Sequence, residues 1–282
     1  MCGYEVQISY LQPVVTLTSS TCLISPSRRE FISNIYFLIR LYCFVGSMDN
    51  DDKFPLHAAA REGRVTVFEG LLKSDPKLSQ RKDNDGRYPI HWAASSNNLD
   101  IVQLLANQRS FDADVQDESG WSPLMISASV PEGESVVKLI MSKDADVNLK
   151  NSAGQTALHF VASKKNLDIA RVLIDNGAST RVRDRRGQYP IHRAAAVGSV
   201  PMVTLLLKNR SPLNPADNEG FTPLHHAIAE GHGDTAVALL KEGADFTLKN
   251  SADELALDLA PDKEVRRYVL QGAEREGIEL SG

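Results

Sequence analysis

Cysteine is nearly absent from this chain. Its three cysteines, Cys2, Cys22 and Cys43, lie within the first 43 residues, and the remaining 239 of the 282 residues contain none. The main part of the chain therefore holds no disulfide, no thiolate metal site and no cysteine nucleophile. Such a composition is typical of a reducing compartment, and we expect a cytoplasmic and nuclear protein.

Positive charge is not in excess either. The formal net charge is −5, whereas a general nucleic-acid binder is normally basic. The sequence also lacks the patterns G-x-G-x-x-G, G-x-x-x-x-G-K-[S/T] and G-x-S-x-G, and no two histidines have His-x-x-x-His spacing. These patterns form phosphate-binding loops, serine nucleophiles and zinc sites. We therefore expect no nucleic acid, no cofactor, no metal ion and no enzymatic activity.

Charge of either sign is scarce in residues 1–47, which contain five charged side chains. The apolar stretch FISNIYFLIRLYCFVG (31–46) has 16 residues and includes Arg40, so it is short for a membrane span. It also starts too late for a signal peptide and lacks a clean cleavage site. Composition changes abruptly at Met48. We interpret residues 1–47 as a non-native or mis-assigned extension. A disordered arm and a membrane anchor are the alternatives, and only the anchor implies membrane attachment.

What the chain does contain is an internal repeat. Seven similar segments begin at steps of 34, 34, 34, 33, 33 and 33 residues: FPLHAAA (54), YPIHWAA (88), SPLMISA (122), TALHFVA (156), YPIHRAA (189), TPLHHAI (222) and LALDLA (255). This period and a T-P-L-H-x-A box are typical of ankyrin repeats. We predict an all-α repeat solenoid of helix-turn-helix units joined by hairpin loops. It should span residues 48–272 and be followed by a polar tail, 273–282.

Each repeat carries local signals for this architecture. Ser122, Thr156 and Thr222 are suited to cap the start of a first helix, and proline follows two of them at the first helical position. Tyr88 and Tyr189 replace the capping residue, so they should lose that cap and gain packing. Apolar residues at i, i+3 and i+4, as in DIVQLL, indicate a second helix. Glycine-containing polar runs such as DNDG and DRRG predict the hairpins.

Five of the seven histidines occupy one position of the box. They are His57, His91, His159, His192 and His225. A residue that recurs with the structural period belongs to the scaffold, and we expect each imidazole to hydrogen-bond backbone groups of an adjoining loop. His91 beside Trp92 is therefore interpreted as a scaffold residue and not as part of an active site.

The hairpin tips change in charge along the stack. The early tips carry the acids Asp83, Asp85, Asp117 and Glu118. The middle tips carry the bases Lys150, Arg181, Arg183, Arg185 and Arg186. Near the middle of the stack, a first helix ends with Lys164 and Lys165. Hairpin tips and first helices form the concave, partner-binding face of such a solenoid. Complementary charge would orient a partner, and Trp92 and Trp121 would supply anchors. Each charge run is also explained as a solvated loop.

Several segments resemble the gankyrin family, which comprises the proteasome non-ATPase regulatory subunit 10 and its fungal counterpart. They are QRKDNDGRYPIHWAAS, DESGWSPL, LHFVASKK, IDNGASTRVRDRRGQYPIHRAAAVGS and GFTPLHHAIAEGHGDTAVALL. The resemblance covers roughly residues 50–272. It implies a monomeric assembly chaperone of the proteasome regulatory particle that grips the C-terminal domain of a base AAA ATPase subunit.

By position, the resemblance implies contacts to that partner from Asp85, Arg87, Glu118 and Lys164. The surface pattern alone adds Trp92, Trp121, Arg185 and Arg186 to the partner-binding residues. The alternative function is that of a different ankyrin adaptor, in transcriptional or kinase regulation. Such an adaptor would use the same scaffold with other partners.

Overall fold

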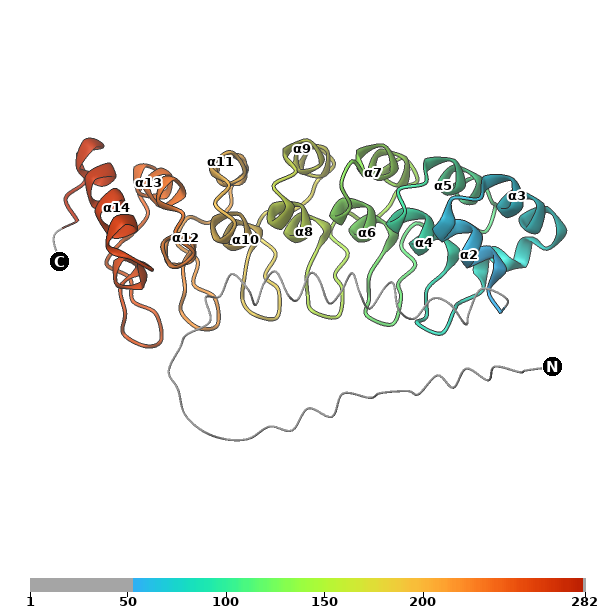
Figure 1. Ribbon diagram of the computed structural model, residues 1–282, viewed down its shortest axis with the longest axis horizontal. Coiled ribbons are helices and arrows are strands. Elements are labelled where there is room, and N and C mark those ends of the chain that lie inside the picture. The colour runs from blue at the N-terminus through green and yellow to red at the C-terminus, as the bar shows by residue number, and fades with distance from the viewer. Residues whose placement is uncertain (1–52, 281–282) are drawn as a thin grey trace, which may run out of the picture.

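The computed structural model describes residues 53–280, which form an elongated stack of helix pairs (Figure 1). The first helices of the pairs are α2 (Pro55–Glu62), α4 (Pro89–Ser95), α6 (Pro123–Ser129), α8 (Ala157–Lys164), α10 (Pro190–Ala196) and α12 (Pro223–Ala229). The second helices are α3 (Val65–Ser74), α5 (Leu99–Ala106), α7 (Glu134–Met141), α9 (Leu167–Asp175), α11 (Val200–Lys208) and α13 (Gly233–Lys241). The predicted all-helical repeat solenoid is thus confirmed.

Short irregular elements occur towards the two ends of the stack. The 3-10 helix η1 (Pro76–Gln80) follows α3, and the 3-10 helix η2 (Ala256–Leu259) replaces a first helix in the last repeat. The chain then forms α14 (Lys263–Arg275). Hairpin loops connect the repeats and project from one edge of the stack (Figure 1).

The helix starts follow the box sequence. The Ser122 hydroxyl accepts a hydrogen bond from the Met125 N–H, and the Thr222 hydroxyl accepts one from the His225 N–H. The Thr156 hydroxyl lies 3.0 Å from Nδ1 of His159. The Tyr88 ring stacks on the His91 imidazole, with centroids 5.9 Å apart. Tyrosine at this position therefore gives packing in place of a hydroxyl cap, as predicted.

Box histidines tie neighbouring repeats together. Nδ1 of His91 accepts the Tyr88 N–H at 3.1 Å, and its Nε2 lies 3.0 Å from the Trp121 carbonyl oxygen in the next hairpin. His57, His159 and His192 also bond with Nε2 to a backbone carbonyl about one repeat further on. The predicted scaffold role is confirmed for these four. In His225, Nδ1 accepts the Thr222 N–H at 3.2 Å, whereas the buried Nε2 forms no hydrogen bond within residues 53–280.

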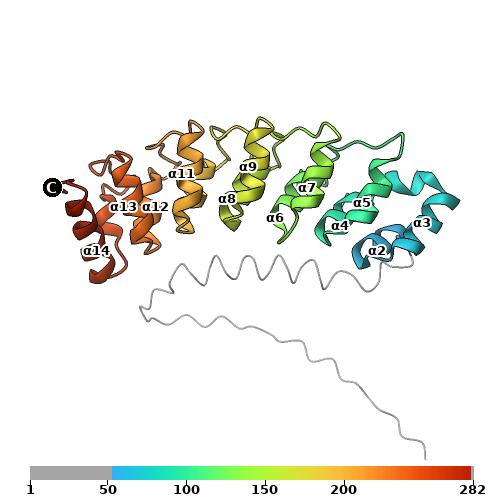
Figure 2. The ribbon, with the colours of Figure 1, turned by 90° about the horizontal axis from the view of Figure 1, so that it is seen from above.

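Small side chains let the first helices pack closely. Ala59, Ala93, Ala162 and Ala194 are fully buried between successive repeats. The first helices are in closer contact with one another than the second helices are. The row of first helices is therefore shorter, and the stack bends towards it into the arc seen in Figure 2. The concave face carries the first helices and the hairpins.

The last helix extends further than the sequence indicated. We expected the repeats to end at residue 272 and a polar tail to follow from 273, whereas α14 continues to Arg275. Asp262 caps its start, and an apolar stripe at Val269, Gly272 and Ala273 is buried. A methyl group at Gly272 would lie 2.4 Å from Val237 of α13. Close packing against α13 thus explains both the length of α14 and its glycine.

The expectations for residues 1–47 lie outside the described part of the chain. Among residues 53–280, no helix is both long and apolar enough to cross a membrane.

Candidate protein-binding surface

Each hairpin is closed by one acid or amide that bonds to its own backbone. These residues are Asp83, Asp117, Asn151, Asp184, Asp217 and Asn250. In each, Oδ1 accepts the N–H groups of the residues two and four positions later, for example those of Ser119 and Trp121, both at 2.9 Å from Asp117. In each of the four aspartates, Oδ2 forms a hydrogen bond with a side-chain nitrogen instead. These carboxylates therefore stabilise the hairpins, and the charges at the tips remain for a partner.

Arg87, for which the resemblance implies a contact to the partner, lies at the closing end of its hairpin, where its N–H donates to Oδ1 of Asp83. Its Nε donates to Oδ2 of the buried Asp117 at 3.2 Å, and its guanidinium lies 5.1 Å from the Trp92 ring centroid. The Trp92 Nε1–H donates to Oδ2 of Asp83 at 2.7 Å. Arg87 and Trp92 are both half-buried. They belong to a network that joins two hairpins, and each remains partly exposed.

Trp121 forms an aromatic pair that the sequence did not reveal. It stacks on Phe160 of α8, with ring centroids 4.2 Å apart and an interplanar angle of 30°. Both rings are half-buried and pack against the core. Large, rigid and partly exposed aromatic groups are frequent anchors of protein interfaces. The expected role of Trp121 as an anchor therefore extends to Phe160.

One repeat position presents side chains from the first helices. It is the position after the box histidine, which is replaced by Met125 in α6. In α4, α6, α8, α10 and α12 this position is occupied by Trp92, Ile126, Phe160, Arg193 and His226, and we name these five residues the first-helix row. All except the buried Ile126 are half-buried, although the neighbouring box residues are buried. We singled out only Trp92 from the sequence. The signal that would have found the others is their shared position in the repeat.

The C-terminal members of the first-helix row bond to hairpin acids. Nη2 of Arg193 donates to Oδ2 of Asp184 at 2.9 Å, and Nε2 of His226 lies 3.0 Å from Oδ2 of Asp217. Burial raises the pKa of the Asp217 carboxyl. Hydrogen bonds from His226, Gln188 and the Phe221 N–H outweigh that effect and hold its pKa well below the ordinary value. Asp217 therefore stays ionised and keeps this hairpin closed.

Some of the charges that the sequence placed at the tips are exposed, whereas Asp117 is buried and Asp83 is half-buried. Asp85 and Glu118 are exposed on adjacent tips, joined by a bond of 3.4 Å from the Glu118 N–H to the Asp85 carbonyl. Arg185 and Arg186 are exposed on one later tip, and Lys164 is exposed at the end of α8. Acidic tips, a half-buried aromatic centre and basic tips thus follow one another along the stack.

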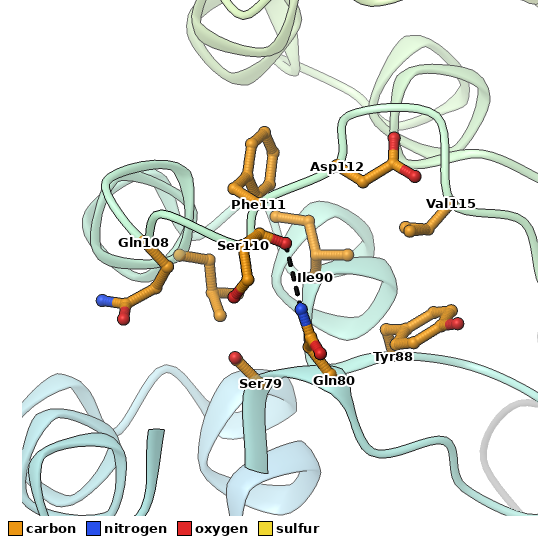
Figure 3. A pocket seen from close by; sticks show the side chains of 10 residues that line it. Ser79, Gln80, Tyr88, Ile90, Gln108, Ser110, Phe111, Asp112 and Val115 are labelled. Carbon is orange, nitrogen blue, oxygen red and sulfur yellow. Dashed lines mark hydrogen bonds between the residues drawn. The ribbon is translucent and has the colours of Figure 1, made fainter. Parts of the chain in front are cut away.

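A pocket of about 360 Å³ lies apart from these residues (Figure 3). It is formed by η1, α4, the end of α5 and the loop after it, and its walls include Ile90, Leu105 and Val115. Gln80 Nε2 donates across it to the Ser110 carbonyl at 3.1 Å (Figure 3). None of the site residues predicted from the sequence lines it. Among residues 53–280, no group of three His, Cys, Asp or Glu side chains is arranged to hold a metal ion.

Comparison with known proteins agrees with this geometry. A family model described as ankyrin repeats (3 copies) matches residues 23–117, 56–151, 107–184, 124–211 and 158–250, which together extend over most of the chain. The chain belongs to the ankyrin-repeat family. Ankyrin repeats are typically non-catalytic modules that bind other proteins.

A solved ankyrin structure shares the fold. The ankyrin repeat domain of Bcl-3, described as a unique member of the IkappaB protein family, matches with a TM-score of 0.63 and 22% sequence identity. The match covers 76% of this chain and 97% of that one. At this identity the likeness concerns the ankyrin fold alone. No curated protein matches the sequence.

Proposed function

We propose that this ankyrin-repeat protein is a monomeric assembly chaperone of the proteasome regulatory particle, working in the cytoplasm and nucleus. It grips the C-terminal domain of a base AAA ATPase subunit with its concave face. The resemblance of five segments to the gankyrin family suggests this partner. The structural observation that supports the proposal most is the order of features on the concave side. Exposed acids come first, the Trp121–Phe160 pair follows, and exposed bases come last.

These features have different roles in the proposed grip. Trp121 and Phe160 supply apolar contact area that is already held rigid by stacking, so little conformational entropy is lost on binding. Asp85 and Glu118 attract basic groups of the partner, whereas Lys164, Arg185 and Arg186 attract acidic groups. Opposite charges at the two ends fix the direction in which the ATPase domain docks. Arg87 and Trp92 hold the first two hairpins in place and offer their exposed edges.

Reversal of two tip charges tests this arrangement. We expect Asp85→Lys with Glu118→Lys to weaken binding of the purified ATPase C-terminal domain by at least about thirtyfold, because about 2 kcal/mol is lost when one desolvated interface charge is reversed. The affinity is measured by isothermal titration calorimetry. A pull-down with the full chain from cell extract, analysed by mass spectrometry, shows whether base ATPases are recovered.

The matched control is Asp175→Lys with Glu242→Lys. These acids are exposed at the ends of the second helices α9 and α13, and the control gives the same change in net charge. It should leave the affinity within about twofold of the wild type, because exposed charges outside an interface contribute little. A folded chain that recovers no base ATPase contradicts the proposal. Recovery of transcriptional or kinase regulators in their place would support the adaptor alternative.

A further inference from the structure

The hairpin between α9 and α10 has a charge pattern that the proposed grip uses only in part. We name residues 180–188 the arginine hairpin. It contains Arg181, Arg183, Arg185 and Arg186, and all four side chains are exposed. Exposure alternates from Arg181 to Arg185, since Val182 is half-buried and Asp184 is buried. The cations at 181, 183 and 185 therefore form an outward row, whereas Asp184 turns inward to Arg193.

No carboxylate neutralises this row within the described part of the chain. None of the four arginines forms an ion pair with a side chain of residues 53–280. The hairpin's own acid, Asp184, accepts the Arg186 and Gln188 N–H groups on Oδ1 and Arg193 on Oδ2. Asp217 of the next hairpin is likewise occupied by Gln188 and His226. The exposed positive charge is thus available to an external anion.

The backbone that carries the row is held from both sides. The Arg185 N–H donates to the Ala153 carbonyl of the preceding hairpin, and the Asn218 N–H of the following hairpin donates to the Arg186 carbonyl, both at 2.9 Å. Asn218 Nδ2 also donates to the Arg185 carbonyl at 2.8 Å. A ligand therefore meets a fixed backbone, and the cost of binding is limited to ordering the arginine side chains. One of these, Arg183, donates through Nη2 to the neutral Oδ1 of Asn218 at 3.4 Å, so its charge is not neutralised by that bond.

We propose that the arginine hairpin is a docking site for an acidic polypeptide segment in an extended conformation, with carboxylates at alternate residues. Alternate side chains of an extended peptide lie on one side, about 7 Å apart, which suits cations placed at 181, 183 and 185. Guanidinium groups bind carboxylates through paired, charge-assisted hydrogen bonds. This site goes beyond the proposed grip, because Arg181 and Arg183 lie outside it and any protein with such a segment would fit.

The surrounding charge favours a peptide over a nucleic acid. The whole chain has a net charge of −5, so a long polyanion would meet repulsion beyond the arginine hairpin. Glu219 is exposed on the next hairpin and Asp85 and Glu118 on earlier ones. Exposed lysines also lie next to it, at Lys150 of the preceding hairpin and at Lys164 and Lys165 at the end of α8. The densest positive charge is nevertheless on one hairpin, which matches a segment of a few residues.

Fluorescence anisotropy tests this proposal with the full chain and a labelled peptide of alternating serine and glutamate. We expect saturable binding that weakens as the salt concentration rises from about 50 to about 300 mM, because added ions screen exposed charges. Arg183→Glu with Arg185→Glu should weaken the affinity at least about tenfold. Arg183→Gln with Arg185→Gln should also weaken the affinity for the peptide. This neutral double variant replaces the charge-reversed one in the test if the latter does not fold.

The matched control is Arg109→Glu with Arg267→Glu, two exposed arginines elsewhere on the stack that give the same change in net charge. It should change the affinity less than about twofold. Equal losses in both double variants would mean that binding follows net charge, and the proposal would be wrong. Absence of glutamate-peptide binding at low salt would also overturn it, as would preference for a phosphoserine peptide of the same spacing. No ATPase is present in this assay, so its result is independent of the chaperone proposal.

Discussion

Acidification from about pH 7 to about pH 5 is expected to lower the free energy of unfolding of the repeat stack by about 4 kcal/mol. The cause lies in His159 and His192. Burial lowers the pKa of each imidazole to about 4 from its ordinary value of 6.5, and His226 lowers the pKa of His192 further. Burial also lowers the pKa of His57, His91 and His225. The scaffold histidines thus make the solenoid acid-sensitive.

The sign follows from proton binding in the two states. Between the folded pKa of about 4 and the unfolded value of 6.5, the unfolded chain binds protons that the folded chain does not. Stability is therefore fully present above the unfolded pKa and is lost as the pH falls towards 4. At pH 5, each of the two histidines accounts for about 2 kcal/mol of the loss.

Urea-induced unfolding, followed by circular dichroism at several pH values, measures this effect. His192→Gln should be less stable at pH 7 because the bond to the Pro215 carbonyl is altered, and its stability should depend less steeply on pH. Nuclear magnetic resonance should show that the His159 and His192 rings of the folded chain remain neutral at pH 5. A urea midpoint that is the same at pH 7 and pH 5 would contradict the predicted role of the histidines.

Removal of one hairpin carboxylate is expected to have a comparable effect. Asp117→Ala should lower the free energy of unfolding by about 3 kcal/mol, because it leaves a half-buried cation and buried donors without an acceptor. The Asp117 side chain is 3% exposed and accepts from Ser119 N–H, Trp121 N–H and Arg87 Nε. Urea unfolding at pH 7 measures the loss.

Asp85→Ala is the control, because it removes an equal charge from a neighbouring hairpin. Only the backbone of Asp85 takes part in the hydrogen bonds of the hairpin, and its side chain is exposed, so we expect a change within about 0.5 kcal/mol. The two variants separate stability from function. Asp85→Ala should weaken binding of the partner, whereas Asp117→Ala should lower the stability of the fold. Equal stability of the two variants would contradict this division. In a double-mutant cycle, Arg87→Ala should cost much less in the Asp117→Ala background than in the wild type.

Much of the fold could be predicted from sequence because each repeat contains its own signals. The box places Pro123 and Pro223 at the first positions of α6 and α12. Gly177 and Gly243 adopt the left-handed conformation that ends a second helix, both with φ of 90°. The exception, the end of α14, depended on contact with α13. That contact is more extensive than those between the other neighbouring second helices.

The candidate surface was less predictable. Asp85 and Glu118 were placed correctly because a hairpin tip is exposed in every repeat. Arg87 and Arg186 look alike in sequence, since both are arginines beside a hairpin glycine. The first is half-buried against Asp117, 30 residues away, and the second is exposed. Phe160 drew no attention as a single aromatic residue, but stacking on Trp121 makes it part of the concave centre.

The sequence by itself determined the repeat, the scaffold histidines and the absence of cysteine chemistry from residues 44–282, since these depend on periodicity and composition. Only the tertiary structure decided which charges are exposed. In these hairpins, the partner of a buried carboxylate comes from one of two places. Asp184 is paired with Arg193 of the first helix that follows it, and Asp117 is paired with Arg87 of the preceding hairpin. Burial of an ion without a partner is costly. The stacking of the repeats, which buries a carboxylate, therefore determines which arginines form ion pairs within the protein. Those at 181, 183, 185 and 186 remain on the surface.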